Sequence, residues 1–333
     1  MPSSFLSVLL LALVVVLPVA FGQEKPVLPL KYNGGALLTG NVDVAILWYG
    51  SVTKTQKNKI LAFLKSINAM GGPQPSVATW WQVVQGYQTF ANKPTGPIKL
   101  NIVNQKDDTG YSQGRVLVKD MIENLITAAT GGNPSILTII VASDGVSVQD
   151  MCAGSCWQHG SIEINEKPFP YVAVGNPEKE CPICAWPFVK DIHTPKAPLL
   201  RPPSANIGVD AMVMSLAAGL AGAVTNPYED GFTAVYKGND IDASAVCKGI
   251  FGSGAAPGIP GKFLIDKKFG GAFNAYGIGY FGHQVAETPA IKPAKVFRPP
   301  GGGNTFAALM PVPVWTRAPN HHISRVNSQH PDR

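Results

Sequence analysis

Charged residues are scarce in this sequence. Asp, Glu, Lys and Arg make up 14% of its 333 residues, whereas 45% are hydrophobic. Coiled coils and charge-rich disordered chains need a much larger charged fraction, so both classes are excluded. Gly and Pro contribute 35 + 29 = 64 residues, which supplies many turns. The apolar fraction is large enough for a core, and we expect a folded globular protein.

The local motifs of three common activities are also missing. The chain has no G-x-S-x-G, no G-x-x-x-x-G-K-[ST] and no H-E-x-x-H segment. These motifs are typical of serine hydrolases, nucleotide-binding proteins and metalloproteases respectively. We therefore expect neither a cofactor nor a metal ion.

One apolar run stands at the start of the chain. Residues 5–19 read FLSVLLLALVVVLPV, and about 20 residues are needed to span a bilayer. Small residues, Ala20 and Gly22, follow at the positions that a signal peptidase reads. We predict a signal peptide at residues 1–22, secretion of a chain that starts at Gln23, and no stable membrane insertion after cleavage. An uncleaved membrane anchor is the alternative.

Five cysteines fit an oxidising compartment. Cys152 and Cys156 form a C-x-x-x-C pair, and Cys181 and Cys184 form a C-x-x-C pair. Disulfides are favoured in secreted proteins, and four clustered cysteines allow three connectivities. A four-thiolate zinc site and a redox-active C-x-x-C motif are the alternatives. The odd count leaves Cys247 as the expected unpaired thiol.

Strand and helix patterns alternate along the chain. Apolar runs predict strands at residues 41–49, 97–103, 136–142 and 171–175, and a hairpin at 262–275 around Gly270 and Gly271. Apolar residues at helical spacing predict helices at 53–67, at 77–90 with Ser76 as cap, at 113–129 and at 209–224. This alternation predicts a single layered α/β domain with a mixed sheet flanked by helices and with disulfide-containing loops.

Two proline-rich segments break these patterns. Residues 187–203 hold five prolines and are predicted to be an extended surface loop. Residues 287–333 hold eight prolines and a Gly-Gly-Gly run, which predicts a disordered tail. The tail has six basic and two acidic residues, so it contributes 6 − 2 = 4 of the chain's net charge of +6. The body at residues 23–286 is close to neutral, and we expect no nucleic acid as partner.

A few titratable residues are candidates for acid–base chemistry. His159 lies in a stretch that also holds Asp144 and Asp150, and Asp210 lies in the first turn of the last predicted helix. A structural hydrogen bond is the favoured role for His159. The cap of a helix is the favoured role for Asp210, because a carboxylate suits the helix N-terminus.

Several long segments resemble one protein family. They are YNGGALLTGNVDVAILWYG (32–50), SVATWWQVVQGY (76–87), VQDMCAGSCWQHG (148–160), YVAVGNPEKECPICAWPF (171–188), NIGVDAMVMSLAAGLAGAVTNPYEDGF (206–232) and FLIDKKFGGAFNAYG (263–277). In this order they resemble the EXORDIUM / phosphate-induced protein family of plant secreted proteins. The resemblance implies an apoplastic protein linked to growth, cell expansion and brassinosteroid or nutrient response, without an established catalytic activity.

One family feature is missing from this chain. Some relatives carry a His-Glu-x-x-Glu pattern in the helix between the G-V-D and T-N-P segments, reminiscent of zinc hydrolases. The corresponding positions here are Ala218, Gly219 and Gly222, none of which can bind a metal. The resemblance therefore implies no metal site on this helix.

The prediction is a secreted, non-enzymatic protein of the apoplast and cell wall. It acts by binding a wall polysaccharide or an apoplastic or receptor protein. One alternative is a wall-modifying hydrolase that uses acidic residues such as Asp144, Asp150 or Asp210 together with His159. Sugar cleavage would need paired carboxylates. A metallohydrolase-like scaffold that has lost its metal site is another.

Overall fold

The computed structural model describes most of residues 30–243 and two short strands beyond them. The described residues are 30–69, 77–153, 155–186, 188–190, 199, 202, 204–236, 238–243, 263–265 and 272–274. The predicted signal peptide, Ser76, Cys247, the predicted tail at 287–333 and most of the loop predicted at 187–203 lie outside them.

A five-stranded sheet forms the centre of the domain. Its order is β3 (Lys99–Asp108), β2 (Asn41–Tyr49), β5 (Leu137–Ala142), β8 (Lys167–Gly175) and β7 (Gln158–Ile164). The first four strands are parallel, and β7 runs antiparallel to β8. All six residues of β5 are buried, because parallel strands are covered on both faces and therefore read as continuous apolar runs.

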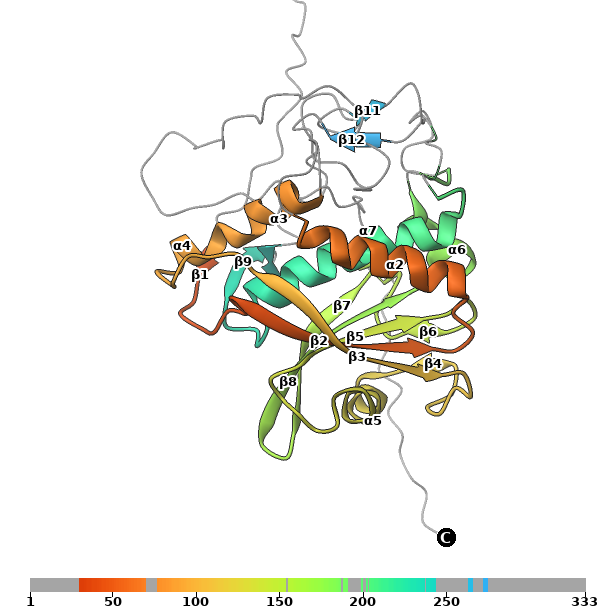
Figure 1. Cartoon of the computed structure of the whole chain (residues 1–333), viewed down its shortest axis with the longest axis horizontal. Helices are drawn as coiled ribbons and strands as arrows, with labels where there is room; N and C mark the ends of the chain where they lie inside the picture. The colour runs from red at the N-terminus through yellow and green to blue at the C-terminus, as the bar shows by residue number, and fades with distance from the viewer. Residues whose placement is uncertain are drawn as a thin grey trace, which may run out of the picture.

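Helices cover both faces of this sheet (Figure 1). On one face lie α2 (Lys54–Ile67), α3 (Val77–Gln85), α4 (Tyr87–Phe90) and α7 (Ile207–Thr225), and on the other lies α5 (Lys119–Thr130). Each face has its own apolar core. The predicted α/β domain with a mixed, helix-flanked sheet is thus confirmed.

The apolar spacing explains how two of these helices pack. In α2 the buried residues are Ile60, Phe63, Leu64 and Ile67, and Thr53 begins the helix with a capping box to Gln56. Helix α7 is long and apolar enough to cross a membrane, but 89% of its apolar window is buried inside the protein. It therefore packs as a core helix.

Several predicted boundaries were wrong. The helix predicted at 113–129 begins at Lys119, because the preceding residues form β4 (Val116–Leu117), which pairs with β6 (Ser147–Val148). The helix predicted at 77–90 is divided at Gly86 into α3 and α4. Strand β3 continues to Asp108, five residues beyond the predicted end at residue 103.

Strand β7 was not predicted, and β8 begins four residues earlier than expected. The two strands form a hairpin whose turn residues, Asn165 and Glu166, have φ values of 50° and 61°. This left-handed pair makes the tight turn that suits the twist of a hairpin. Residues 158–164 contain Gly160 and polar residues, so their composition gives no clear strand pattern.

The structure also describes a smaller sheet and a separate pair of strands. The small sheet has the order β1 (Lys31–Tyr32), β9 (Phe232–Tyr236) and β10 (Asn239–Asp242). Strands β11 (Phe263–Ile265) and β12 (Ala272–Asn274) pair antiparallel within the predicted hairpin, whose turn at Gly270 and Gly271 lies outside the described residues.

Two disulfides join the loop after β6 to α6 (Pro177–Glu180) and the 3-10 helix η1 (Pro182–Ala185). They are Cys152–Cys181 and Cys156–Cys184. Cys181 and Cys184 are each bonded to a different cysteine of that loop, an arrangement that differs from both the four-thiolate zinc alternative and a Cys181–Cys184 redox disulfide.

Candidate functional site

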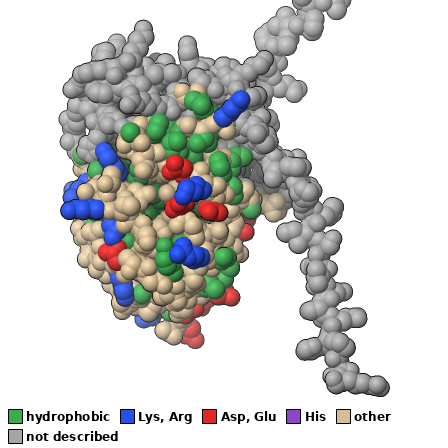
Figure 2. All heavy atoms as spheres, turned by 90° about the vertical axis from the view of Figure 1, so that its right-hand side faces the viewer, with side chains coloured by type: hydrophobic (Ala, Val, Ile, Leu, Met, Phe, Trp, Pro, Cys, Tyr) green, Lys and Arg blue, Asp and Glu red, His purple; other side chains and the backbone are tan. Residues whose placement is uncertain are grey.

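The candidate site lies at the edge of the sheet formed by the carboxyl ends of its parallel strands. The chain leaves β2 toward β3 on one side and leaves β5 toward β8 on the other, so the carboxyl ends of β2 and β5 form a topological switch point. Open α/β sheets bind ligands at such points. Figure 2 faces this edge, where acidic and basic side chains lie next to one another.

Five polar side chains gather here, and we call them the edge cluster: Ser51, Tyr111, Ser143, Asp144 and Lys179. Ser51 follows β2, and Ser143 and Asp144 follow β5 directly. The backbone N–H of Ser143 donates to the carbonyl of Tyr49 at 2.8 Å, which holds the two strand ends together.

Tyr111 occupies the centre of the edge cluster. Its hydroxyl lies 3.3 Å from the Ser51 hydroxyl. Hydrogen bonds from Ser51 and then Ser143 lower the pKa of the Tyr111 phenol to about 8. The guanidinium of Arg115 lies 3.9 Å from the centroid of the Tyr111 ring. Tyr111 is thus a partly activated phenol on the surface of the protein.

The backbone of this site is held in uncommon conformations. Tyr111 has a φ of 54°, in the left-handed region that non-glycine residues rarely adopt. Gly50 has a φ of 81°, and a Cβ there would overlap the Ser143 hydroxyl and the Tyr111 ring. Glycine is therefore required at position 50, since it permits both the turn and the close approach of these side chains.

The loop that carries Tyr111 is fixed at both ends. The buried Tyr49 hydroxyl donates to the carbonyl of Gly114 at 2.6 Å and accepts from the backbone N–H of Gln113 at 2.9 Å. The Asp108 carboxylate accepts from the backbone N–H of Ser112 at 3.1 Å. These contacts keep Tyr111 in its left-handed conformation.

Charged groups extend the edge cluster. Lys179 Nζ lies 2.6 Å from Asp144 Oδ2, and their side chains are 71% and 41% exposed. The hydrogen bond to Asp144 raises the pKa of Lys179. Asp144 Oδ1 is enclosed and accepts no hydrogen bond from the described residues.

The predicted acid–base candidates do not share a site through any described contact. Asp150 lies exposed in a left-handed turn with a φ of 61°. Burial, followed by the charges of Glu229 and Asp150, raises the pKa of Tyr171 to about 12. Asp210 is buried in the first turn of α7, where it accepts from the backbone N–H of Ser204 at 2.8 Å. Burial raises its pKa to about 6.

His159 has a partner that the sequence did not indicate. Its Nε2 lies 2.5 Å from Asp242 Oδ2 of strand β10, 83 residues away. The His159 side chain is 8% exposed, and its Nδ1 has no hydrogen-bond partner among the described residues.

The space around His159 is filled by helix α7. A Cβ at Gly222 would overlap the imidazole, and one at Gly219 would lie 2.6 Å from Val172 Cγ1 and 3.3 Å from Trp157 Cδ1. We call His159, Trp157, Gly219 and Gly222 the α7–β7 interface. Within the described ranges, no three His, Cys, Asp or Glu side chains are grouped to hold a metal ion.

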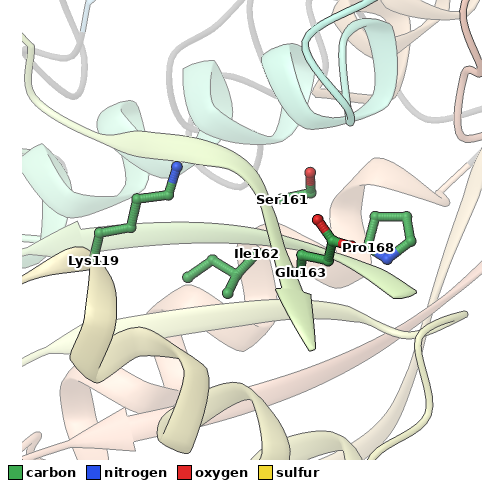
Figure 3. Close-up of a pocket in the computed structure, with 5 residues that line it drawn as sticks. All are labelled: Lys119, Ser161, Ile162, Glu163 and Pro168. Carbon is green, nitrogen blue, oxygen red and sulfur yellow. The ribbon is translucent and has the colours of Figure 1, made fainter. Parts of the chain in front are cut away.

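A hollow lies beside the edge strand β7. Figure 3 shows its five lining residues, Lys119 from the start of α5 and Ser161, Ile162, Glu163 and Pro168 from the β7–β8 hairpin. Its volume is about 550 Å³. The lining residues include one cation and one anion, without the converging hydroxyl groups of the edge cluster.

Sequence reasoning identified Asp144 but missed the rest of the edge cluster. Tyr111 lies in a loop without apolar periodicity. The available signal was the position of Ser51 and Ser143 within two residues of the ends of two buried parallel strands, since strand ends at a switch point converge.

Comparisons with known proteins agree with one another. Residues 30–283 match the family model described as the phosphate-induced protein 1 conserved region. The chain is 37% identical to Protein EXORDIUM-like 2 of Arabidopsis thaliana over 268 residues, which is 78% of this chain and 85% of that protein. It is 35% identical to Protein EXORDIUM-like 1 of the same plant over 257 residues, 74% of this chain and 82% of that protein. It is also 34% identical to Protein PHOSPHATE-INDUCED 1 of Nicotiana tabacum over 266 residues, 78% and 84% of the two chains. No solved structure matches the chain.

Proposed function

This chain belongs to the phosphate-induced protein 1 family, and we propose that it is a secreted apoplastic protein that binds a plant cell-wall polysaccharide through the edge cluster. Secretion is supported by the apolar first segment and by two disulfides, which persist in oxidising compartments. The proposal includes the link with growth, cell expansion and brassinosteroid or nutrient response that resemblance to the family implies.

The conformation of Tyr111 is the observation that carries this proposal. A bulky residue in the left-handed region costs about 1–3 kcal/mol, and such residues gather at binding and catalytic sites. Here the strained residue lies between Ser51 and Ser143 at the switch point of the sheet. The hydrogen bonds of the loop keep this conformation, which presents the phenol to solvent.

The chemistry of the edge cluster suits a sugar polymer. Hydroxyl groups both donate and accept hydrogen bonds, the Asp144 carboxylate accepts, and the Lys179 ammonium donates. A sugar chain presents hydroxyl groups that require both kinds of partner. The exposure of Lys179 and Asp144 leaves this edge accessible to a polymer.

Binding is favoured over hydrolysis by the contacts of the acidic residues. Sugar cleavage needs two carboxylates about 5–9.5 Å apart on either side of the bond. Asp144 contacts Lys179, whereas Asp210 is buried against Ser204. Gly219 and Gly222, where the family resemblance implies glutamates in some relatives, have no side chain to bind a metal, and their surroundings are packed.

The proposal is tested with the purified secreted protein on immobilised homogalacturonan, xyloglucan and arabinogalactan. We expect one of these polymers to retain the protein. Asp144→Asn should weaken that binding at least about tenfold, equivalent to about 1.4 kcal/mol. The matched control is Glu163→Gln, the same change of carboxylate to amide at the hollow beside β7, which should bind like the wild type.

Three results would overturn the proposal. Equal binding by both variants and the wild type would remove the edge cluster as the site. Release of soluble sugars from a polymer would favour the hydrolase alternative. Retention of an apoplastic protein without retention of any polysaccharide would favour the receptor alternative.

A further inference from the structure

The two disulfides are in contact with each other. Cys181 Sγ of the first bond lies 3.2 Å from Cys184 Sγ of the second. Both bonds join the loop after β6 to the α6–η1 segment. Four sulfur atoms thus form a continuous row, in the order 152, 181, 184 and 156.

Burial distinguishes one sulfur-bearing residue from the other three. Cys156, Cys181 and Cys184 are each 1% exposed, whereas Cys152 is exposed and has a left-handed φ of 74°. An external thiolate must reach a disulfide sulfur to exchange with it. Cys152 is therefore the point of attack.

The loop itself brings Cys152 near Cys156. The backbone N–H of Cys152 donates to the carbonyl of Ser155 at 2.8 Å, and Met151 and Ser155 form an isolated bridge. The backbones of Met151 and Cys152 thus lie beside that of Ser155. A bond between Cys152 and Cys156 would close this short loop.

We propose that this row is a thiol-exchange site that converts the two long-range disulfides into Cys152–Cys156 and Cys181–Cys184. The co-reactant is a low-molecular-weight thiol such as glutathione. Its thiolate attacks Cys152 Sγ, the Cys152–Cys181 bond breaks, and its electron pair goes to Cys181. The Cys181 thiolate attacks Cys184 Sγ, and Cys156 leaves as a thiolate.

The last step returns the co-reactant. The Cys156 thiolate attacks Cys152 in the mixed disulfide, forms Cys152–Cys156 and releases the thiolate of the small thiol. Two disulfides are broken and two are formed, so no oxidant or reductant is consumed. The result frees the loop after β6 from η1, because sequence separations of 29 and 28 are replaced by separations of 4 and 3 residues.

The test uses the full secreted protein with Cys247→Ser, so that glutathione supplies the only free thiol. The protein is incubated with reduced glutathione, quenched with acid, alkylated and digested with trypsin without a reductant. Cleavage after Lys179 and Lys190 gives peptide 180–190, which holds Cys181 and Cys184. In the starting form this peptide is attached to the peptide with Cys152 and Cys156.

We expect glutathione to raise the amount of free peptide 180–190 with an internal disulfide at least about tenfold over untreated protein. The matched control carries Cys156→Ser and Cys184→Ser, which removes the second bond. There the reaction should stop at its first step, with glutathione on Cys152 and an alkylated Cys181.

A second variant tests the central step without an added thiol. In Cys152→Ser, Cys181 is released next to Cys184, and we expect alkylation to be shared between Cys181 and Cys156. Alkylation of Cys181 alone would contradict the exchange. Glutathione on peptide 180–190 of the control, full reduction to four thiols, or an unchanged cross-linked pair in the treated protein would each overturn the proposal.

Discussion

The edge cluster and the α7–β7 interface use similar polar groups in opposite settings. At the edge cluster, Lys179 and Asp144 form an ion pair between side chains that are 71% and 41% exposed. At the α7–β7 interface, His159 contacts Asp242 with exposures of 8% and 18%, and Gly222 leaves room only for the imidazole.

The difference teaches that packing determines what a polar side chain can do. His159 was a candidate for acid–base chemistry with a structural hydrogen bond as its favoured role, and its ring packs against a core helix beside Asp242. Tyr111 had no such signal, yet the fold holds its phenol at the surface in a strained conformation. The α7–β7 interface should therefore respond to substitution through stability, and the edge cluster through binding.

The largest effect is expected from Gly222→Ala. The added methyl group must displace the His159 imidazole and its contact with Asp242, which we expect to cost about 3 kcal/mol of unfolding free energy through overpacking. Urea denaturation measures this cost. Gly96→Ala is the control, because a Cβ there meets nothing within 4 Å. Equal stability of the two variants would show that the interface is loosely packed.

The next effect concerns Asp210, another enclosed polar group. Burial raises its pKa from 3.8 to about 6. Between these pH values the unfolded chain loses this proton while the folded chain keeps it, so the unfolding free energy falls as pH rises. Asp210→Asn should remove a fall of up to about 3 kcal/mol and make the protein more stable at pH 7. If the unfolding free energies of Asp210→Asn and the wild type depended on pH in the same way, Asp210 would not have the raised pKa that its burial implies.

A smaller effect is expected at the edge cluster. Ser51→Ala removes the hydrogen bond that contributes most to the low pKa of Tyr111. The phenol should then titrate closer to its ordinary value of 10, by roughly one unit, with an unfolding free energy within about 0.5 kcal/mol of the wild type. Ultraviolet absorbance of tyrosinate follows the titration, with Tyr111→Phe identifying the signal. A Tyr111 titration that does not change would place the phenol away from Ser51.

The central strands and α7 were predictable because these segments consist almost entirely of apolar and small residues, which are typical of buried elements. Residues 41–49 and 136–142 are nearly continuous apolar runs, and α7 combines apolar with small residues that allow close packing. These elements can be recognised from the local sequence without knowing which distant segments pack against them. The fold class followed from their alternation with helical patterns.

The candidate site was less predictable because its contacts join distant segments. Ser51 and Tyr111 are 60 residues apart, and His159 and Asp242 are 83 apart. The pairing of the cysteines likewise depends on how the loop after β6 meets η1, so their spacing left three connectivities open. Asp144 was identified, but its partner Lys179 comes from a helix 35 residues away.

The binding role of the edge cluster is tested most directly by titrating the retained wall polysaccharide into Tyr111→Phe, His159→Gln and wild-type protein. Each variant is checked for folding by urea denaturation. The account predicts that Tyr111→Phe weakens binding about tenfold at unchanged stability, whereas folded His159→Gln binds like the wild type. Full binding by Tyr111→Phe, together with lost binding by folded His159→Gln, would contradict it.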